Sequence, residues 1–446
     1  MTLVILTYFF ILERKYNKDL LSATRITFYF CMLFIIADIL VAIDIKNLDQ
    51  YCTQNRLQHC TKYNFLATTV LSNIGYSLLM VGVFLGSHTK GRIIKTSLGL
   101  FFPVSKFSGD RNSLFFGIVF IAIGTFLLLS LINSVGGLVY LWTHMEERSL
   151  LLGSNGYFII LQSFFMVFGS LLVYVGLRER GLFRLSVFVI LLTLCSFSLL
   201  GSRGDIANFL FIFLFLYHYR VRKFVARDFV SLKSMLVGLL LIAVLIGGYV
   251  VRTPTYFTSD DIVADVIADA GNIISEQVVG RFWKNERGSL SLEYFDKNPL
   301  FYGSTYVGFF VAPIPRSIWP EKPPLEPGKY TLAMAERRIS PPMASGDLPN
   351  EAQPPGVWEA YWNFGIVGLI LCFCFSGYLF GRLYQFFIRH HHNNYSIMLY
   401  GNFAYFGAPW LSSNGLMEFA TFSVCMYVAA FLIVFFKLIY PRLKYS

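Results

Sequence analysis

Long apolar runs recur along the chain, and short loops rich in Lys and Arg separate most of them. A bilayer core takes about 20 apolar residues per helix, so each run is expected to be a transmembrane helix. A membrane β-barrel would instead show short segments of alternating polarity. The runs cover residues 1–12, 26–43, 63–86, 113–133, 157–177, 185–219, 234–251, 358–380, 395–411 and 416–436.

The run 185–219 is interrupted by Gly201-Ser-Arg203-Gly-Asp205. It is far too long for one span and a little short for two. We therefore expect two short helices whose connection lies below the outer membrane surface. Non-helical backbone at such depth is tolerated only where it is buried in protein or lines a watery cavity. The fold class predicted from these runs is an all-α polytopic membrane protein with about 11 transmembrane helices.

Basic residues are concentrated in every second loop between the apolar runs. They gather in 14–25, 90–111, 178–184, 220–233, 382–389 and 437–444, whereas 44–62 and 134–156 hold few. The positive-inside rule places the basic loops in the cytoplasm. The N-terminus is then periplasmic and the C-terminus cytoplasmic, in a bacterial inner membrane. The same rule accounts for the net charge of +11, so no nucleic-acid partner is expected.

One long polar segment interrupts the apolar series and divides the chain. Residues 1–251 form eight predicted spans, 252–357 a large periplasmic loop, and 358–446 the last three spans. Structureless loops of this length are usually functional or disordered. The many aromatic residues of this loop argue against disorder. Within it, an amphipathic helix is predicted over 258–279, where Thr258-Ser-Asp-Asp resembles a helix start.

Charged residues near the spans share one predicted location. They map to the outer ends of the spans and comprise Asp38, Arg203, Asp205, Arg252, Glu359 and Glu418. A charge at mid-bilayer costs roughly 2.5 to 3.5 kcal/mol, which makes such groups candidates for function. An ion path would spread them through the membrane depth, whereas this arrangement indicates a polar cavity open to the outside. For Asp38 and Glu418, snorkelling to interfacial water is an adequate alternative.

Arginine dominates the outer side, and four positions are candidates for binding a substrate diphosphate: Arg203, Arg252, Arg281 and Arg316. Guanidinium groups bind phosphate oxygens bidentately and without a metal. The loop contains no D-x-D motif, so no metal and no cofactor is expected. Arg287, Arg337 and Arg338 fit ordinary surface or loop-bracing roles equally well.

A carboxylate is the predicted general base, because no histidine lies between His218 and His390. Glu359 is the first candidate and Asp205 the second. The alternative for Glu359 is a helix N-terminal carboxylate stabilised by the helix dipole. The run His390-His-His is predicted to be cytoplasmic and solvated. Cys52 and Cys60 flank a predicted external loop, and their spacing permits a disulfide without requiring one.

Four segments together carry a family resemblance. They are Gly201-Ser-Arg203-Gly, Tyr302-Gly-Ser-Thr-Tyr306, Pro315-Arg316-Ser-Ile-Trp319-Pro-Glu-Lys-Pro323 and Glu359-Ala-Tyr-Trp-Asn363-Phe-Gly365. With the predicted topology they resemble the Wzy-type oligosaccharide repeat-unit polymerases, which make O-antigen or capsular polysaccharide. The third segment is the most specific.

The resemblance implies a GT-C-like glycosyltransferase. It would polymerise undecaprenyl-diphosphate-linked oligosaccharide units on the periplasmic face, among membrane lipids and with a chain-length regulator protein as a further partner. The arginines would bind the diphosphate, and Trp319, Tyr306 and Tyr361 would stack on sugars, unless these rings merely pack. The alternatives are a flippase or transporter of lipid-linked oligosaccharide, for which no internal repeat is visible, and an O-antigen ligase. The related ligases use a histidine that this chain lacks.

Overall fold

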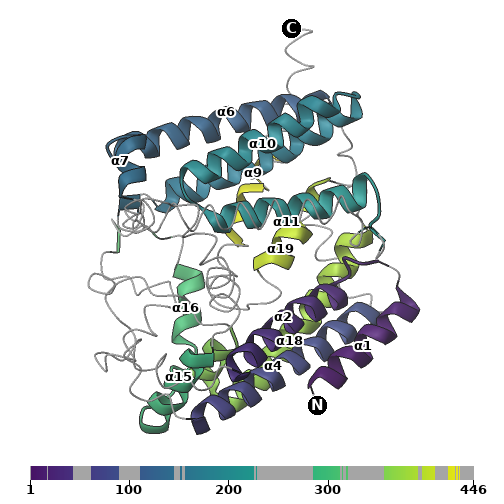
Figure 1. The fold of residues 1–446 in the computed structure, drawn as a ribbon, viewed down its shortest axis with the longest axis vertical. Coiled ribbons are helices and arrows are strands. Elements are labelled where there is room, and N and C mark those ends of the chain that lie inside the picture. Colours follow the sequence, from purple (N-terminus) through teal and green to yellow (C-terminus); the bar gives the residue numbers. More distant parts are fainter. Residues whose placement is uncertain are drawn as a thin grey trace. The chain divides into compact units, whose positions relative to one another are not determined.

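The structure, a computed structural model, describes residues 2–17, 19–43, 62–89, 111–144, 151–152, 156–225, 228, 285–311, 314, 318–319, 356–389, 394–406, 420–426, 428–429 and 431. All regular elements in these ranges are helices (Figure 1). The prediction of an all-α protein is confirmed for this part of the chain. The chain forms two compact units: unit 1 comprises residues 1–101, 275–389 and 403–420, and unit 2 comprises 102–274, 390–402 and 421–446.

Four described helices are long and apolar enough to cross a membrane. They are α4 (Lys62–His88), α6 (Arg111–Ser134), α9 (Gly156–Glu179) and α18 (Gly356–Arg389). The helix α10 (Phe183–Leu199) is apolar but shorter. These helices confirm the expectation of a multi-pass helical membrane protein, while the number of eleven spans stays a prediction.

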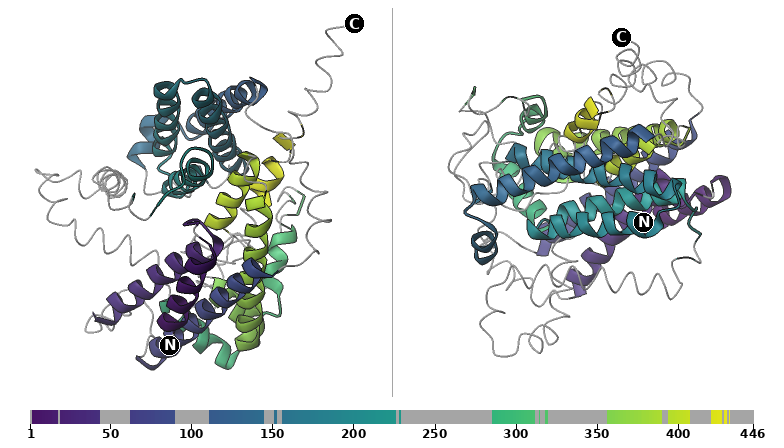
Figure 2. Two further views of the ribbon diagram at one scale, coloured as in Figure 1. Left: turned by 90° about the vertical axis from the view of Figure 1, so that its right-hand side faces the viewer. Right: turned by 90° about the horizontal axis from the view of Figure 1, so that it is seen from above.

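Unit 1 is built around the pair α4 and α18, with α1 (Thr2–Tyr16) and α2 (Ala23–Ile43) packed beside α4 (Figures 1 and 2). The backbones of α4 and α18 touch. A Cβ atom built on Gly82 would lie 2.2 Å from the carbonyl oxygen of Cys374, and one on Gly377 would lie 2.2 Å from that of Leu79. Small residues permit this approach, as in other membrane helix pairs.

The helix α18 is longer than the predicted span 358–380, because it continues through Arg382 to Arg389. It bends at Gly365, whose φ of 63° and ψ of −153° are not helical. Glycine adopts a positive φ without a steric penalty, so the sequence places the bend at this residue.

Two short helices of unit 1 lie in the predicted external loop: α15 (Asn285–Lys297) and α16 (Ser304–Val311). The sequence predicted neither. The predicted helix 258–279, the span 234–251 and the pair Cys52 and Cys60 fall outside the described residues.

Unit 2 packs α6 against α9, which also contacts α10 and α11 (Arg203–Arg220). In this unit the hydroxyls of Ser170 on α9 and Thr193 on α10 are 2.5 Å apart. The helix α19 (Asn394–Phe406) lies with Gly401 against Ile212 of α11. A shorter helix, α7 (Leu138–Thr143), was not predicted.

The predicted break between two short helices is confirmed. The helix α10 ends at Leu199 and α11 begins at Arg203. The backbone N–H of Ser202 donates to the carbonyl of Phe197 at 3.0 Å, which closes the end of α10. This bond, with Gly201 at a φ of 62°, is the arrangement that commonly terminates helices.

Candidate active site

A buried cluster of three polar side chains lies where the start of α18 meets α16. The hydroxyl of Thr305 on α16 donates to Oε1 of Glu359 at 2.9 Å. Nδ2 of Asn363, one turn further along α18, donates to the hydroxyl of Thr305 at 2.7 Å and to the backbone carbonyl of Glu359 at 2.8 Å. Glu359 and Asn363 are completely buried and Thr305 is 4% exposed. The hydroxyl of Thr305 is therefore held between a carboxylate that accepts its hydrogen and an amide that donates to its oxygen.

The bend at Gly365 explains how the chain before α16 reaches this cluster. The backbone N–H of Phe301 donates to the carbonyl of Trp362 at 2.8 Å, and that of Tyr302 donates to the carbonyl of Asn363 at 3.0 Å. In a straight helix these carbonyls would accept from residues four positions later, beyond the bend. The segment entering α16 supplies donors to them and is fixed in register with Glu359.

The helix α15 docks on the same part of α18. Nε1 of Trp362 donates to the hydroxyl of Ser291 at 2.6 Å, and both residues are fully buried. A Cβ atom on Gly288 would lie 2.2 Å from the ring of Trp358, so glycine permits this contact. The sequence predicted no role for Ser291 or Gly288.

The predicted sugar-binding aromatics have different environments. The ring of Tyr306 stacks on Phe364, with centroids 6.4 Å apart. Burial raises the pKa of Tyr306 well above its usual value, and the nearby Glu359 carboxylate raises it further, so its phenol remains neutral. Tyr361 is half-buried and makes an edge contact with Trp358. Trp319 is 38% exposed, which leaves part of its indole free for a ligand.

Asp205, the second candidate base, lies in unit 2 in the first turn of α11. The hydroxyl of Ser163 on α9 donates to its Oδ1 at 2.7 Å, and the hydroxyl of Ser202 donates to its Oδ2. Asp205 therefore fastens the break between α10 and α11 to α9. An acidic residue in a first turn also interacts favourably with the helix dipole. These contacts favour a structural role for Asp205.

Most of the predicted diphosphate-binding arginines fall outside the described residues. Arg203 is the first residue of α11, and its side chain is not among those described. Arg252, Arg281 and Arg316 also fall outside the described residues. Their role as phosphate ligands stays a prediction. Within the described ranges, no three His, Cys, Asp or Glu residues are grouped as they would be around a metal ion.

The sequence missed Thr305 and Asn363 as site residues. Both lay within segments that carry the family resemblance, and Asn363 follows Glu359 by four positions, which places the two on one helix face. That spacing was the available signal. The pairing of Thr305 with Glu359 spans 54 residues of sequence and had no local signal.

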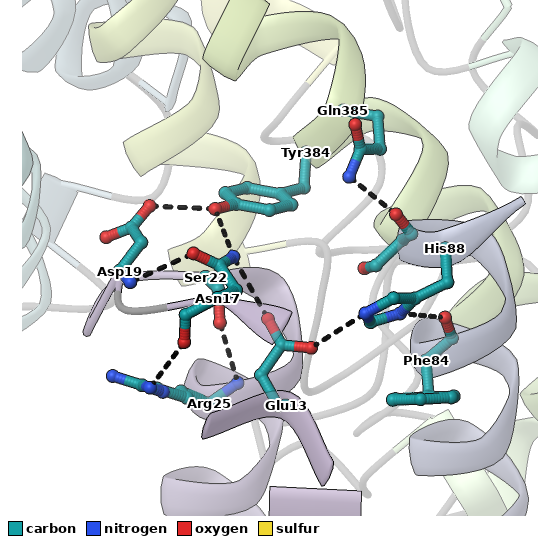
Figure 3. A network of polar contacts seen from close by, with 10 residues as sticks. Glu13, Asn17, Asp19, Ser22, Arg25, Phe84, His88, Tyr384 and Gln385 are labelled. Atoms are coloured by element: carbon teal, nitrogen blue, oxygen red, sulfur yellow. Dashed lines mark hydrogen bonds and ion pairs between the residues drawn. The ribbon is translucent and has the colours of Figure 1, made fainter. Parts of the chain in front are cut away.

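A second polar network of unit 1, partly buried, lies near the other end of α18 (Figure 3). Nδ2 of Asn17 lies within hydrogen-bond distance of Oε1 of Glu13, at 3.0 Å, and of the hydroxyl of Tyr384, at 2.9 Å. The Tyr384 hydroxyl itself donates to Oδ2 of Asp19 at 2.8 Å. Oε2 of the fully buried Glu13 lies 3.5 Å from Nε2 of His88 on α4. The network thus ties α1, α4 and α18 together.

No protein-family model matches the chain, and neither the curated proteins nor the solved structures gave a significant match.

Proposed function

We propose that the chain is a membrane glycosyltransferase that polymerises oligosaccharide repeat units carried on undecaprenyl diphosphate. A hydroxyl at the non-reducing end of the incoming unit attacks the anomeric carbon of the growing glycan. The bond from that carbon to the diphosphate oxygen breaks, and undecaprenyl diphosphate leaves with the electron pair. The hydroxyl proton passes to Glu359. The expected site is the periplasmic face of a bacterial inner membrane.

The observation that carries this proposal is the contact of Glu359 with an alcohol. A general base must lie within about 2.6 to 3.2 Å of the group whose proton it takes. Glu359 makes such a contact with the Thr305 hydroxyl, at 2.9 Å and without exposure to solvent. The cluster also lies at the start of the apolar helix α18, on the side predicted to face outward. A base for a sugar hydroxyl on a lipid-anchored substrate belongs in such a place.

The contacts of Asp205 make it the weaker candidate for the base. Its two carboxylate oxygens accept hydrogen bonds from Ser163 and Ser202, which hold the break before α11. We propose that this break positions Arg203 for the diphosphate, together with Arg252, Arg281 and Arg316. Positive charge there stabilises the charge that develops on the leaving group. Trp319, Tyr306 and Tyr361 remain the proposed sugar-stacking residues, and a GT-C-like fold is part of the same proposal.

The test uses a strain that lacks this gene and carries variants on a plasmid. Glu359→Gln, Arg203→Ala and Arg316→Ala are compared with Glu179→Gln, a partly exposed carboxylate at the end of α9. Surface polysaccharide is analysed on gels, and membrane expression is measured in parallel. Loss of the long-chain ladder with a single capped unit retained, and a normal ladder for Glu179→Gln, supports the proposal.

Other outcomes contradict it. Complete loss of surface sugar, including the single unit, indicates export or ligation instead of polymerisation. A normal ladder in all three site variants removes these residues from the site.

A further inference from the structure

The burial of Glu359 bears on how an acceptor could reach it. If Glu359 is the base, the acceptor hydroxyl has to contact its carboxylate. In the structure that carboxylate is completely buried, and the group that donates to its Oε1 is an alcohol of the protein itself, on Thr305. The side chain of Thr305 therefore occupies the place that an acceptor hydroxyl requires.

The surroundings of the Thr305 hydroxyl fit any alcohol. Its hydrogen is given to Glu359, and its oxygen accepts from Nδ2 of Asn363 at 2.7 Å. A hydroxyl needs one acceptor and at least one donor, and this pair supplies both. Oδ1 of Asn363, buried and without a hydrogen-bond partner within the described structure, offers an acceptor for a neighbouring hydroxyl. Adjacent hydroxyls are the chemistry of a sugar.

The element that carries Thr305 is small and has an exposed outer side. The helix α16 has 8 residues, with Val307 48% and Phe310 75% exposed. Two residues with positive φ precede it, Tyr302 at 47° and Gly303 at 89°. Positive φ is unfavourable for a non-glycine residue such as Tyr302, and strained backbone of this kind is frequent at mobile functional segments. The strained Tyr302 and the conformationally free Gly303 therefore form a natural hinge.

We infer that α16 is a lid over Glu359, closed by the Thr305 hydroxyl, and that a sugar hydroxyl of the acceptor takes the place of Thr305 when the lid opens. This inference rests on the proposed function. In the resting protein the lid keeps water away from the carboxylate. The acceptor opens the site by competing for the contacts that Thr305 makes with Glu359 and Asn363, so the base is exposed only when a hydroxyl is ready to bind it.

Hydrogen–deuterium exchange of the purified full-length protein tests the lid. The peptide covering 304–311 is followed with and without lipid-linked repeat units extracted from the strain lacking this gene. We expect several-fold faster exchange in this peptide when the extract is present. Thr305→Val, which keeps the shape but lacks the hydroxyl, should exchange fast without extract, whereas Thr305→Ser should remain slow. The peptide covering α15 is the internal control.

Kinetics separate this inference from the proposed function. In polymerisation assays with the same extract, Thr305→Val should lower the KM for repeat units several-fold, because the acceptor no longer competes with a hydroxyl of the protein. If polymer forms but extract leaves exchange at 304–311 unchanged, the lid is overturned and the function stands. A loss of kcat at unchanged KM in Thr305→Val would also overturn the lid, since Thr305 would then position Glu359. If the wild type forms no polymer from the extract, the proposed function itself fails.

Discussion

The hydroxyl of Tyr384 donates a hydrogen bond to Oδ2 of Asp19 at 2.8 Å, across 365 residues of sequence. The same hydroxyl lies 2.9 Å from Nδ2 of Asn17. One phenol therefore joins the last part of α18 to the turn between α1 and α2 (Figure 3). Tyr384 is 2% exposed, whereas Asn17 and Asp19 are partly exposed.

Replacement of Tyr384 by Phe should destabilise unit 1. The change removes two part-buried hydrogen bonds, those of the Tyr384 hydroxyl with Asn17 and with Asp19, and such a bond contributes about 0.5 to 1.5 kcal/mol. Thermal unfolding of the detergent-purified protein measures the loss. Tyr378→Phe is the matched control, because Tyr378 lies on the same helix and is 37% exposed. Equal melting temperatures for the two variants would contradict the role given to Tyr384.

Alanine at Gly82 or Gly377 should separate α4 from α18. Each added Cβ would lie 2.2 Å from a backbone carbonyl oxygen of the other helix. Because backbone atoms within a helix cannot move aside, the two helices must separate. Overpacking of this kind costs typically about 1 to 3 kcal/mol, and a backbone clash belongs at the upper end. Folded yield and thermal stability in detergent report the effect.

Gly204→Ala provides the control for these glycine substitutions. A Cβ atom on Gly204, in the first turn of α11, meets nothing within 4 Å. We expect no loss of stability, since alanine is the better helix former. If Gly204→Ala proved as harmful as Gly82→Ala, the close approach of α4 and α18 would not be the cause.

Removal of the Ser291 hydroxyl should loosen α15 from α18. In Ser291→Ala the buried Nε1 of Trp362 loses the acceptor that it has at 2.6 Å. An unsatisfied buried donor costs about 1 to 3 kcal/mol, and this cost destabilises the packing of α15 against α18. Limited proteolysis should then cut within 285–297 sooner than in the wild type. Ser198→Ala is the control, because that exposed hydroxyl donates only within its own helix, to the carbonyl of Leu194. Unchanged cleavage in Ser291→Ala would argue against the docking of α15 on α18.

Substitution of Asp205 by Asn should affect folding more than chemistry. The carboxylate accepts from Ser163 and Ser202, and an amide can accept through only one of its two groups. We expect lower thermal stability and a polysaccharide ladder that persists in proportion to the folded protein. Ladder intensity per folded molecule is the measurement. A stable Asp205→Asn protein without a ladder would return Asp205 to the role of base.

Tyr306 should make no contribution to pH dependence. Burial and the Glu359 carboxylate raise its pKa well above the usual value of a phenol, so the neutral form persists at every pH below that usual value. In Tyr306→Phe the rate of polymerisation falls if the ring binds sugar through its hydroxyl, but the shape of the pH profile between about pH 6 and pH 9 stays the same. A shifted alkaline limb in this variant would show that the phenol ionises.

The apolar runs predicted the described long helices because burial in lipid imposes a length that composition reveals. The break at Gly201 was also readable, since Gly201, Arg203 and Asp205 interrupt the apolar run. The helix α15 was not readable. Its buried face consists of small and polar residues, Gly288, Ser289 and Ser291, in place of an apolar stripe. The eight residues of α16 are too few to separate helix from strand by periodicity.

The candidate site was predicted only in part for a related reason. Glu359 stood out because a carboxylate beside a span is costly. Thr305 and Asn363 are ordinary residues whose importance arises from partners distant in sequence, and no local pattern encodes such a pairing. The network around Tyr384 was missed for the same reason, since its members are separated by up to 367 residues.

The bend at Gly365 has a practical consequence for any study of the predicted external loop on its own. Phe301 and Tyr302 take their backbone acceptors from Trp362 and Asn363, which belong to a membrane helix. A soluble fragment cut before α18 would contain α15 and α16 without the surface on which they rest. Such a fragment would therefore adopt a different conformation, in crystals or as an antigen. Full-length protein in detergent or nanodiscs is the proper material for both uses.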